Sequence, residues 1–298
     1  MKESLSISLI QANLHWEDVD ANLNHFDKLI SVIKEIDLIL LPEMFNTSFC
    51  PKSNHLSESM NGKSVSWMKE ISKKKKCVIA GSLMINEEGK VYNRLVWISK
   101  DGQISTYDKR HLFSLIEEER HISKGDKRLI VELEGWKICP LICYDLRFPV
   151  FSRNDVGYDV LIYLANWPVK RIDAWDALLK ARAIENQCYV IGCIRVGTDP
   201  NGHTYLDGSA MIDYRGSHPL ELEDKQSIAS IEINKSDLLA FRSRLDFLSN
   251  RNEFSIVIPD SGFSLLKYIF IFRVLFKSSL YESGSIVDIL RIIIICKQ

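Results

Sequence analysis

The chain has 298 residues, of which 46% are hydrophobic and 26% charged, and its formal net charge at pH 7 is −1. This length accommodates one large α/β domain or two small ones. A net charge near zero provides no global attraction to nucleic acid or to an anionic membrane, so neither is expected as a partner. The seven cysteines form no C-x-x-C pair, and the alternating polar and apolar residues at the N-terminus do not resemble a secretory signal. These features predict a cytoplasmic protein with free thiols.

Hydrophobic patterning in the first third of the chain predicts two helices and four strands. The helices are expected over 22–36 and 64–75, and the strands over 4–12, 37–41, 77–85 and 91–99. The run 37–41 is short and continuously apolar, which is typical of a strand buried on both faces. It ends in Pro42-Glu43, so a carboxylate stands where a buried strand emerges.

The remainder of the domain continues the same alternation of strands and helices. Strands are expected over 129–133, 136–143, 160–164, 189–196, 209–213 and 228–233, and helices over 174–187 and 236–245. This interleaving predicts a layered α/β sandwich with mixed sheets. Because no Pro/Gly-rich linker or low-complexity tract interrupts residues 1–257, we expect that span to form one domain.

Residues 258–298 differ from the rest in composition. They contain the aliphatic and aromatic segments KYIFIFRVLF and ILRIIIICKQ, interrupted by Lys267, Arg273, Lys277 and Arg291. No uninterrupted apolar run approaches the roughly 18 residues that a membrane-spanning helix needs. Three interpretations of this C-terminal extension are open: an arm packing on the body or on a partner subunit, an extension foreign to the domain, or an amphipathic segment on a membrane surface.

The segment 140–149, PLICYDLRFP, runs from apolar strand residues directly into a cysteine. Cys143 at such a strand end can present its sulfur to a pocket, where the backbone N–H of Tyr144 faces a developing oxyanion. The alternative is a buried, inert thiol, as most free cysteines are. A nucleophilic thiol needs a neighbouring base or cation. The candidate histidine, His111, is more typical of a structural imidazole bonded to the backbone.

Two other charged residues follow predicted strands. Lys109 lies in the polar cluster YDKRHLF (107–113), and Glu43 follows the buried run 37–41. Each by itself is explained by solvation or by capping of the next segment. Together with Cys143, however, they could converge at one edge of the sheet, because ligand sites of open α/β sheets lie at the carboxyl ends of strands.

Three segments resemble, in the same order, the glutamate, lysine and cysteine motifs of the nitrilase, or carbon–nitrogen hydrolase, superfamily. They are LLPEMF (40–45), YDKRHLF (107–113) and LICYDLRFP (141–149). The tetrapeptide ANWP (165–168) and the helix 174–186 extend the likeness, which runs from about residue 4 to residue 256. The resemblance implies a four-layer-forming α-β-β-α sandwich, a homodimer or higher homo-oligomer, and catalysis without a metal or cofactor.

The resemblance also implies a role for each charged residue of these motifs. Glu43 is the expected base, Lys109 the expected cation and Cys143 the expected nucleophile. The family uses a second glutamate after the lysine motif, which holds the lysine and the first glutamate in position. Within the run Glu117-Glu118-Glu119 the spacing favours Glu118, although three adjacent carboxylates leave the choice open.

Within the superfamily the strings EMFNTSF (43–49), CYDLRFP (143–149) and ANWP (165–168) resemble the ω-amidase branch, which deamidates 2-oxoglutaramate and 2-oxosuccinamate. The expected substrate is therefore a small 2-oxo-dicarboxylic acid monoamide. Its carboxylate requires a cation, for which Arg147 is the candidate, although an ion pair of Arg147 with a structural acid is an equal alternative. The residues expected to bind the substrate are Tyr144, Arg147, Phe113, Asn166, Trp167 and Phe45. A different amide, a carbamoyl amide or a nitrile as substrate, and an inactive scaffold on the same fold, are the open alternatives.

Overall fold

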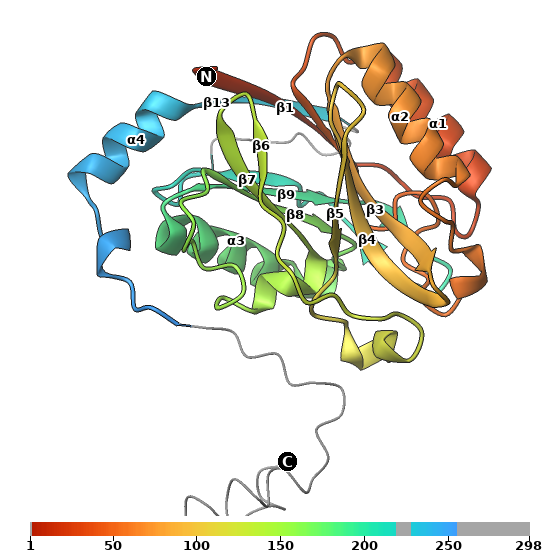
Figure 1. Ribbon diagram of the computed structural model, residues 1–298. Coiled ribbons are helices and arrows are strands. Elements are labelled where there is room, and N and C mark those ends of the chain that lie inside the picture. Colours follow the sequence, from red (N-terminus) through yellow and green to blue (C-terminus); the bar gives the residue numbers. More distant parts are fainter. Residues whose placement is uncertain (1, 219–227, 255–298) are drawn as a thin grey trace, which may run out of the picture. The chain divides into compact units, whose positions relative to one another are not determined.

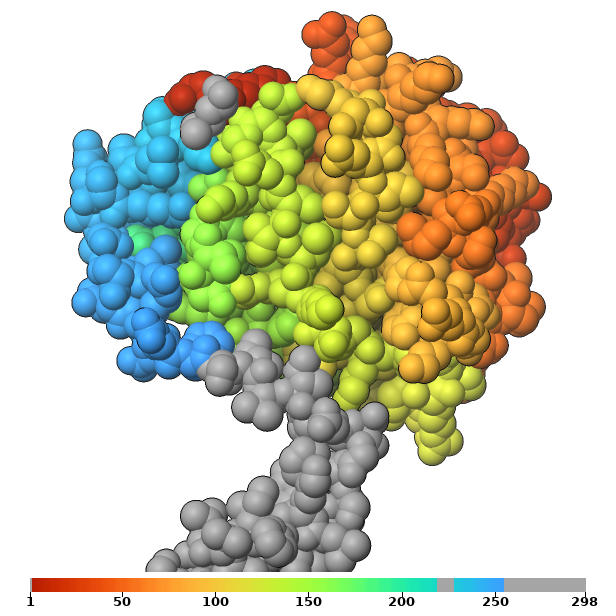
Figure 2. Space-filling view, viewed as in Figure 1, coloured from red at the N-terminus to blue at the C-terminus, as the bar shows by residue number. Residues whose placement is uncertain are grey.

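The computed structural model describes residues 2–218 and 228–254. These residues belong to one compact unit, Met1–Phe254, which is shown as a ribbon in Figure 1 and as a space-filling view from the same side in Figure 2. The predicted C-terminal extension, residues 258–298, lies outside the described residues. In the described ranges, no helix is both long and apolar enough to cross a lipid bilayer.

The first sheet has six strands in the order β13-β1-β2-β3-β4-β5. Its strands are β1 (Ser4–Ile10), β2 (Leu38–Leu40), β3 (Val78–Glu87), β4 (Lys90–Ile98), β5 (Ile104–Asp108) and β13 (Ile228–Asn234). β2 is parallel to β1 and β3, whereas the β3–β4, β4–β5 and β1–β13 pairs are antiparallel. The sheet is therefore mixed, and β2 and β5 run in the same direction.

Two helices cover the outer face of this sheet, α1 (Val19–Ser31) and α2 (Lys63–Lys75). Side chains alternate along β2 between the two faces of the sheet. Ile39 packs with Phe26 of α1 and Met68 of α2, whereas Leu38 and Leu40 belong to the cluster on the opposite face. The short strand β2 is thus buried on both sides, as its continuous apolar run predicts.

The second sheet has five strands in the order β12-β9-β8-β7-β6. Its strands are β6 (Val131–Leu133), β7 (Trp136–Ile142), β8 (Val160–Ala165), β9 (Tyr189–Ile194) and β12 (Ala210–Ile212). β7, β8 and β9 are parallel neighbours, and β6 and β12 are antiparallel edge strands. α3 (Ile172–Asn186) covers the outer face of this sheet (Figure 1). Gly192 of β9 permits the close approach of α3 to the sheet, because a Cβ at this position would lie 2.5 Å from the ring of Trp175 in α3.

The two sheets face each other across a shared apolar core. Leu38 and Leu40 of β2 pack in one cluster with residues of β7, β8 and β9. The Cys193 thiol of β9 donates across the interface to the carbonyls of Ile10 (3.8 Å) and Leu40 (3.6 Å). The layers are thus α1 with α2, the six-stranded sheet, the five-stranded sheet and α3. The predicted α-β-β-α sandwich with mixed sheets is confirmed.

All predicted helices and strands of the domain are present, with their ends shifted by a few residues. The last predicted helix is α4 (Lys235–Arg244). The sequence did not predict the bounds of β5 (Ile104–Asp108), and it did not predict the small two-stranded sheet formed by β10 (Gly197–Thr198) and β11 (Thr204–Tyr205). Its strands are too short to show a hydrophobic period.

Candidate active site

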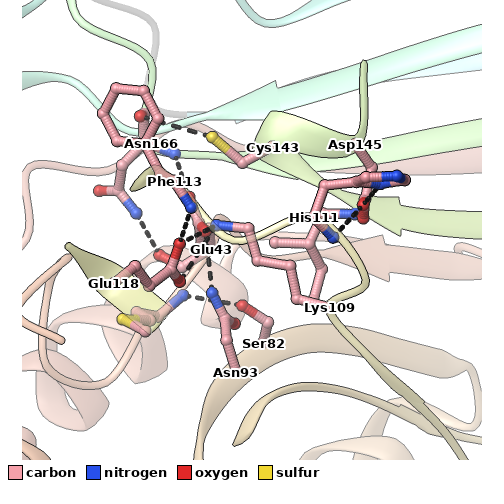
Figure 3. Close-up of polar contacts among 12 residues, drawn as sticks. Glu43, Ser82, Asn93, Lys109, His111, Phe113, Glu118, Cys143, Asp145 and Asn166 are labelled. Carbon is pink, nitrogen blue, oxygen red and sulfur yellow. Dashed lines mark hydrogen bonds and ion pairs between the residues drawn. The ribbon is translucent and has the colours of Figure 1, made fainter. Parts of the chain in front are cut away.

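Glu43 lies just beyond β2 and is fully buried. Its Oε1 accepts hydrogen bonds from Lys109 Nζ (2.8 Å) and Asn93 Nδ2 (2.9 Å). Its Oε2 accepts from the backbone N–H of Asn166 (2.9 Å), whose side-chain amide also donates to the Glu43 carbonyl (2.7 Å). Asn93 lies within β4, Lys109 follows β5 and Asn166 follows β8, so donors from both sheets fix the orientation of the carboxylate (Figure 3).

Lys109 follows β5 directly, and its ammonium is also fully buried. Nζ lies 2.8 Å from Glu43 Oε1 and 3.1 Å from Glu118 Oε2, and 5.1 Å from the centre of the Phe49 ring. Burial alone would lower the pKa of Lys109, but the charges of Glu118 and Glu43 raise that pKa above its usual range. Lys109 therefore remains an ammonium held between two carboxylates.

Glu118 is the member of the glutamate run that reaches Lys109. It is fully buried, and its Oε2 also accepts from the backbone N–H of Phe113 (2.6 Å). Glu117 pairs with Arg120, and the Glu119 side chain is exposed. Among these three glutamates, the geometry therefore brings Glu118 to the cluster and leaves its two neighbours outside it.

Cys143 begins a short 3-10 helix, η4 (Cys143–Arg147), at the end of β7. Its φ angle is +42°, a conformation that residues other than glycine rarely adopt and that recurs at functional turns. Its Sγ lies 3.8 Å from the carbonyl oxygen of Asn166, and Figure 3 shows the sulfur beside Glu43 and Lys109. Burial, and after it the charge of Glu43, raises the pKa of the thiol well above its ordinary value, while Lys109 acts in the opposite direction. The resting group is therefore a thiol that needs a base.

These residues come from two sheets, so the expectation of a single sheet edge is wrong. Glu43 and Lys109 follow β2 and β5 of the six-stranded sheet, whereas Cys143 follows β7 of the five-stranded sheet. The error arises because interleaved strands do not reveal which sheet each one joins. The segments after these strands nevertheless meet, and Figure 3 shows the side chains together.

Asp145 ties the cysteine turn to the segment that carries the lysine. Its carboxylate accepts hydrogen bonds from the Tyr107 hydroxyl (2.7 Å) and from the backbone N–H groups of Ile142 and His111 (3.0 Å each). The His111 Nδ1 atom also lies 2.8 Å from Asp145, and the imidazole stacks on Phe148 at 3.8 Å. His111 is thus held as a structural residue, and it is not the partner of the thiol.

A cavity of about 500 Å³ opens onto Cys143. Its lining contains Phe113, Tyr144, Arg147, Asn166 and Trp167, five of the six residues expected to bind the substrate.

The sixth residue expected to bind the substrate, Phe45, lies outside the cavity lining, so this expectation is wrong. Its ring lies 5.7 Å from Phe26 and 5.8 Å from Trp67, within the core beneath α1 and α2. Gly81 leaves the space that this ring fills, because a Cβ at Gly81 would lie 2.8 Å from Phe45. Phe45 therefore supports the core on the helix side of the sheet and does not line the cavity.

Three residues of the site were not singled out from the sequence: Asn93, Phe49 and Arg171. Asn93 is a fully buried polar residue of β4 that shares one face of the strand with the apolar Val91 and Leu95, and that contrast was an available signal. Phe49 lies over the Lys109 ammonium, and Arg171 lines the cavity with its guanidinium 5.1 Å from the centre of the Phe113 ring. Neither residue stands out in its local sequence.

Comparisons with known proteins show the family to which the chain belongs. Residues 6–242 match the family model described as carbon-nitrogen hydrolase. The chain is 41% identical over 257 residues to omega-amidase YafV of Yersinia enterocolitica, an alignment that covers 85% of this chain and 99% of that protein. It is also 33% identical over 246 residues to 2-oxoglutaramate amidase of Bacillus subtilis, covering 80% of this chain and 95% of the relative.

A solved structure shows the same relationship. XC1258 from Xanthomonas campestris is described as a CN-hydrolase superfamily protein with an arsenic adduct in the active site. It is 37% identical to this chain and has a TM-score of 0.83, with 86% of this chain and 100% of that chain covered. Because the family model and these relatives span most of the sequence, the chain belongs to the carbon–nitrogen hydrolase family.

Proposed function

We propose that this protein is an ω-amidase, which hydrolyses the terminal amide of a small 2-oxo-dicarboxylic acid monoamide such as 2-oxoglutaramate to a carboxylate and ammonia. Relatives named omega-amidase and 2-oxoglutaramate amidase, aligned over nearly their whole length, support this assignment. The observation that carries the chemistry is the buried Lys109 ammonium, 2.8 Å from Glu43 and beside Cys143.

The first step is attack of the Cys143 sulfur on the amide carbonyl carbon. Because burial raises the pKa of this thiol, little thiolate exists at neutral pH and a base must remove the proton during attack. Glu43 is placed to accept it, since its carboxylate is fixed beside the sulfur by Lys109, Asn93 and Asn166.

The carbonyl oxygen acquires negative charge as the C–S bond forms. The Lys109 ammonium and the backbone N–H of Tyr144 stabilise this oxyanion, and removing one such donor typically lowers the rate by about 10²–10³. Glu118 acts through Lys109, because its carboxylate lies 3.1 Å from the ammonium and holds it in place. It is a positioning residue.

The second half of the reaction releases ammonia and restores the thiol. Protonated Glu43 donates its proton to the departing nitrogen, which leaves a thioester on Cys143. Glu43 then deprotonates a water molecule that attacks the thioester, and the carboxylic acid product departs as the sulfur takes back a proton. One carboxylate thus serves as base and acid in both half-reactions.

Ammonia release from a panel of amides tests this proposal. We expect turnover of 2-oxoglutaramate with a higher kcat/KM than that of glutamine, an N-carbamoyl amino acid or an aliphatic nitrile. Turnover of one of these other compounds, without ammonia release from 2-oxoglutaramate, would overturn the ω-amidase assignment and leave the hydrolase family intact.

We also propose a cytoplasmic homodimer. The family resemblance supports the dimer, and the six described cysteines, all of them free thiols, support a reducing compartment. Light scattering on the eluting protein should give about twice the chain mass of 34.3 kDa. A mass equal to that of one chain would contradict the dimer.

A further inference from the structure

Two arginines of the cavity have no oxygen partner in the described part of the chain. Arg147 and Arg171 both line the cavity onto which Cys143 opens, and both are partly buried. Every other described arginine whose side chain is not exposed donates a hydrogen bond to an oxygen: Arg94, Arg110, Arg128, Arg153, Arg182, Arg195 and Arg242. The donors of the two cavity arginines are therefore available to a ligand.

Each of these guanidinium groups lies against an aromatic ring. The Arg147 Cζ is 5.0 Å from the centre of the Trp167 ring, and the Arg171 Cζ is 5.1 Å from the centre of the Phe113 ring. Such a contact holds a planar cation by its face and leaves the N–H donors along its edge unused. Trp167 also donates its indole N–H to the carbonyl of Arg171 (2.7 Å), so one tryptophan contacts both arginines.

The carboxylates of the cavity lining are bonded to other groups. Asp199 accepts hydrogen bonds from the Tyr205 hydroxyl (2.9 Å) and from two backbone N–H groups. Glu17 accepts from the Ser53 hydroxyl. Neither acid forms an ion pair with Arg147 or Arg171 in the described ranges, so these two cations favour an anionic ligand.

We propose that Arg171, together with Arg147, binds the carboxylate at the end of the substrate opposite the scissile amide, and thereby restricts the enzyme to anionic amides. This inference rests on the proposed amidase function and assigns its specificity to named residues. A guanidinium matches a carboxylate through two parallel hydrogen bonds. Arg147 comes from the turn after the nucleophile, whereas Arg171 comes from the segment between β8 and α3. The two guanidinium groups thus bind the carboxylate from two separate segments of the chain.

Arg171→Gln tests the proposal, because it removes the charge and the two-pronged donor. Three amides are compared: 2-oxoglutaramate, glutaramate, which lacks the oxo group, and pentanamide, which lacks the carboxylate. We expect kcat/KM for the two anionic amides to fall about 10- to 100-fold, mainly through KM, as a charge-assisted hydrogen bond is lost. The ratio of kcat/KM between glutaramate and pentanamide is therefore expected to fall by a similar factor, and the ratio for Arg171→Lys to lie between those of wild type and Arg171→Gln. An equal loss for all three amides, or no loss for the anionic pair, would overturn the proposal.

Lys170→Gln is the matched control. Lys170 is the exposed neighbour of Arg171, lies outside the cavity lining, and its substitution removes the same charge. We expect the ratio of kcat/KM between glutaramate and pentanamide to remain that of the wild type. If Lys170→Gln reduced this ratio as strongly as Arg171→Gln, a general field effect would explain the result and the proposed contact would be wrong.

Product binding separates this inference from the amidase function. Binding of 2-oxoglutarate to Cys143→Ala protein, measured by calorimetry, is expected to weaken about 10- to 100-fold when Arg171→Gln is added. That weakening would support the carboxylate site even if the wild-type enzyme released no ammonia from any amide, a result that overturns only the proposed function. Equal affinity with and without Arg171→Gln would overturn the carboxylate site even in an active amidase.

Discussion

The buried ammonium of Lys109 determines what the neighbouring side chains can do. Burying a charge is costly unless the charge is paired and hydrogen-bonded, and here Glu43 and Glu118 both contact the same ammonium. Two carboxylates share one cation, so the cluster retains an acceptor for the proton that Cys143 must lose. In the proposed mechanism, the same ammonium stabilises the oxyanion.

Replacing Glu118 by Gln tests whether this carboxylate keeps Lys109 in place and protonated. Burial favours the neutral amine of Lys109, whereas the charges of Glu118 and Glu43 raise its pKa, so the loss of Glu118 lowers that pKa. We expect kcat to fall roughly 10- to 100-fold, as for other lost charge-assisted contacts, and the alkaline limit of activity to move to lower pH. Glu119→Gln, at the exposed neighbour, should preserve both rate and pH profile. An unchanged pH profile in Glu118→Gln would contradict this role.

The pKa of Cys143 predicts its reactivity without substrate. A raised pKa means that less thiolate exists at any given pH, so alkylation by iodoacetamide should be slower at pH 7 than for a free-cysteine peptide. The rate should continue to rise beyond the ordinary thiol pKa of 9.0. Mass spectrometry of the peptide that contains Cys143 measures this reaction separately from the other cysteines. If the alkylation rate instead reached its plateau at a pH below 9.0, the thiolate would be stabilised, and the raised pKa of Cys143 would be contradicted.

At the scale of elements, Asp145 holds together two segments that carry reacting groups. It accepts hydrogen bonds from Tyr107 and His111, which flank Lys109 in the chain, and from Ile142, which precedes Cys143. The lysine segment and the cysteine turn therefore share one buried carboxylate.

Asp145→Asn should weaken this connection. The amide offers one acceptor oxygen in place of two, and we expect a loss of about 1–3 kcal/mol in the free energy of unfolding. Denaturant unfolding and ammonia release from the same preparation measure stability and activity together. Asp126→Asn, an exposed aspartate, is the control and should change neither. A stability of Asp145→Asn equal to that of wild type would show that these bonds do not support the site.

Much of this organisation could be predicted from the sequence because it is encoded locally. The apolar run before Glu43 and the run before Cys143 mark strands whose ends carry polar residues, and the motif resemblance relates them to Lys109. The assignment of these strands to two facing sheets depends on pairing between distant segments, which hydrophobic periodicity does not record. Phe45 shows the same limit, since the space above Gly81 decides the direction of its ring. The position of Arg171 in the cavity depends on its contact with the Phe113 ring, which is distant in the sequence, so the sequence alone did not indicate it.

At the scale of the whole molecule, the residues of the proposed mechanism lie between Glu43 and Asn166, and the cavity lining extends to Tyr205. The alignment with the Yersinia relative covers 99% of that protein but 85% of this chain.

We therefore propose that residues 1–257 form the hydrolase domain and that residues 258–298 are an addition to it. A chain ending at residue 257 should release ammonia from 2-oxoglutaramate at a rate within about three-fold of the full chain, since the residues of the proposed mechanism all lie between Glu43 and Asn166. Parallel assays of the two chains, normalised to folded protein by circular dichroism, measure this. Loss of activity in a folded, truncated chain would assign the extension a role in catalysis or assembly.

The most direct test of the proposed mechanism compares the two cysteines that line the cavity, Cys143 and Cys50. Cys143→Ala should reduce ammonia release from 2-oxoglutaramate by about 10⁴-fold or more, because the nucleophile is lost while the binding site remains. Cys50→Ala should retain turnover, because its thiol donates only to the backbone carbonyl of Thr47 and has no contact with Glu43 or Lys109 among the described residues. Substantial turnover by Cys143→Ala would contradict the account.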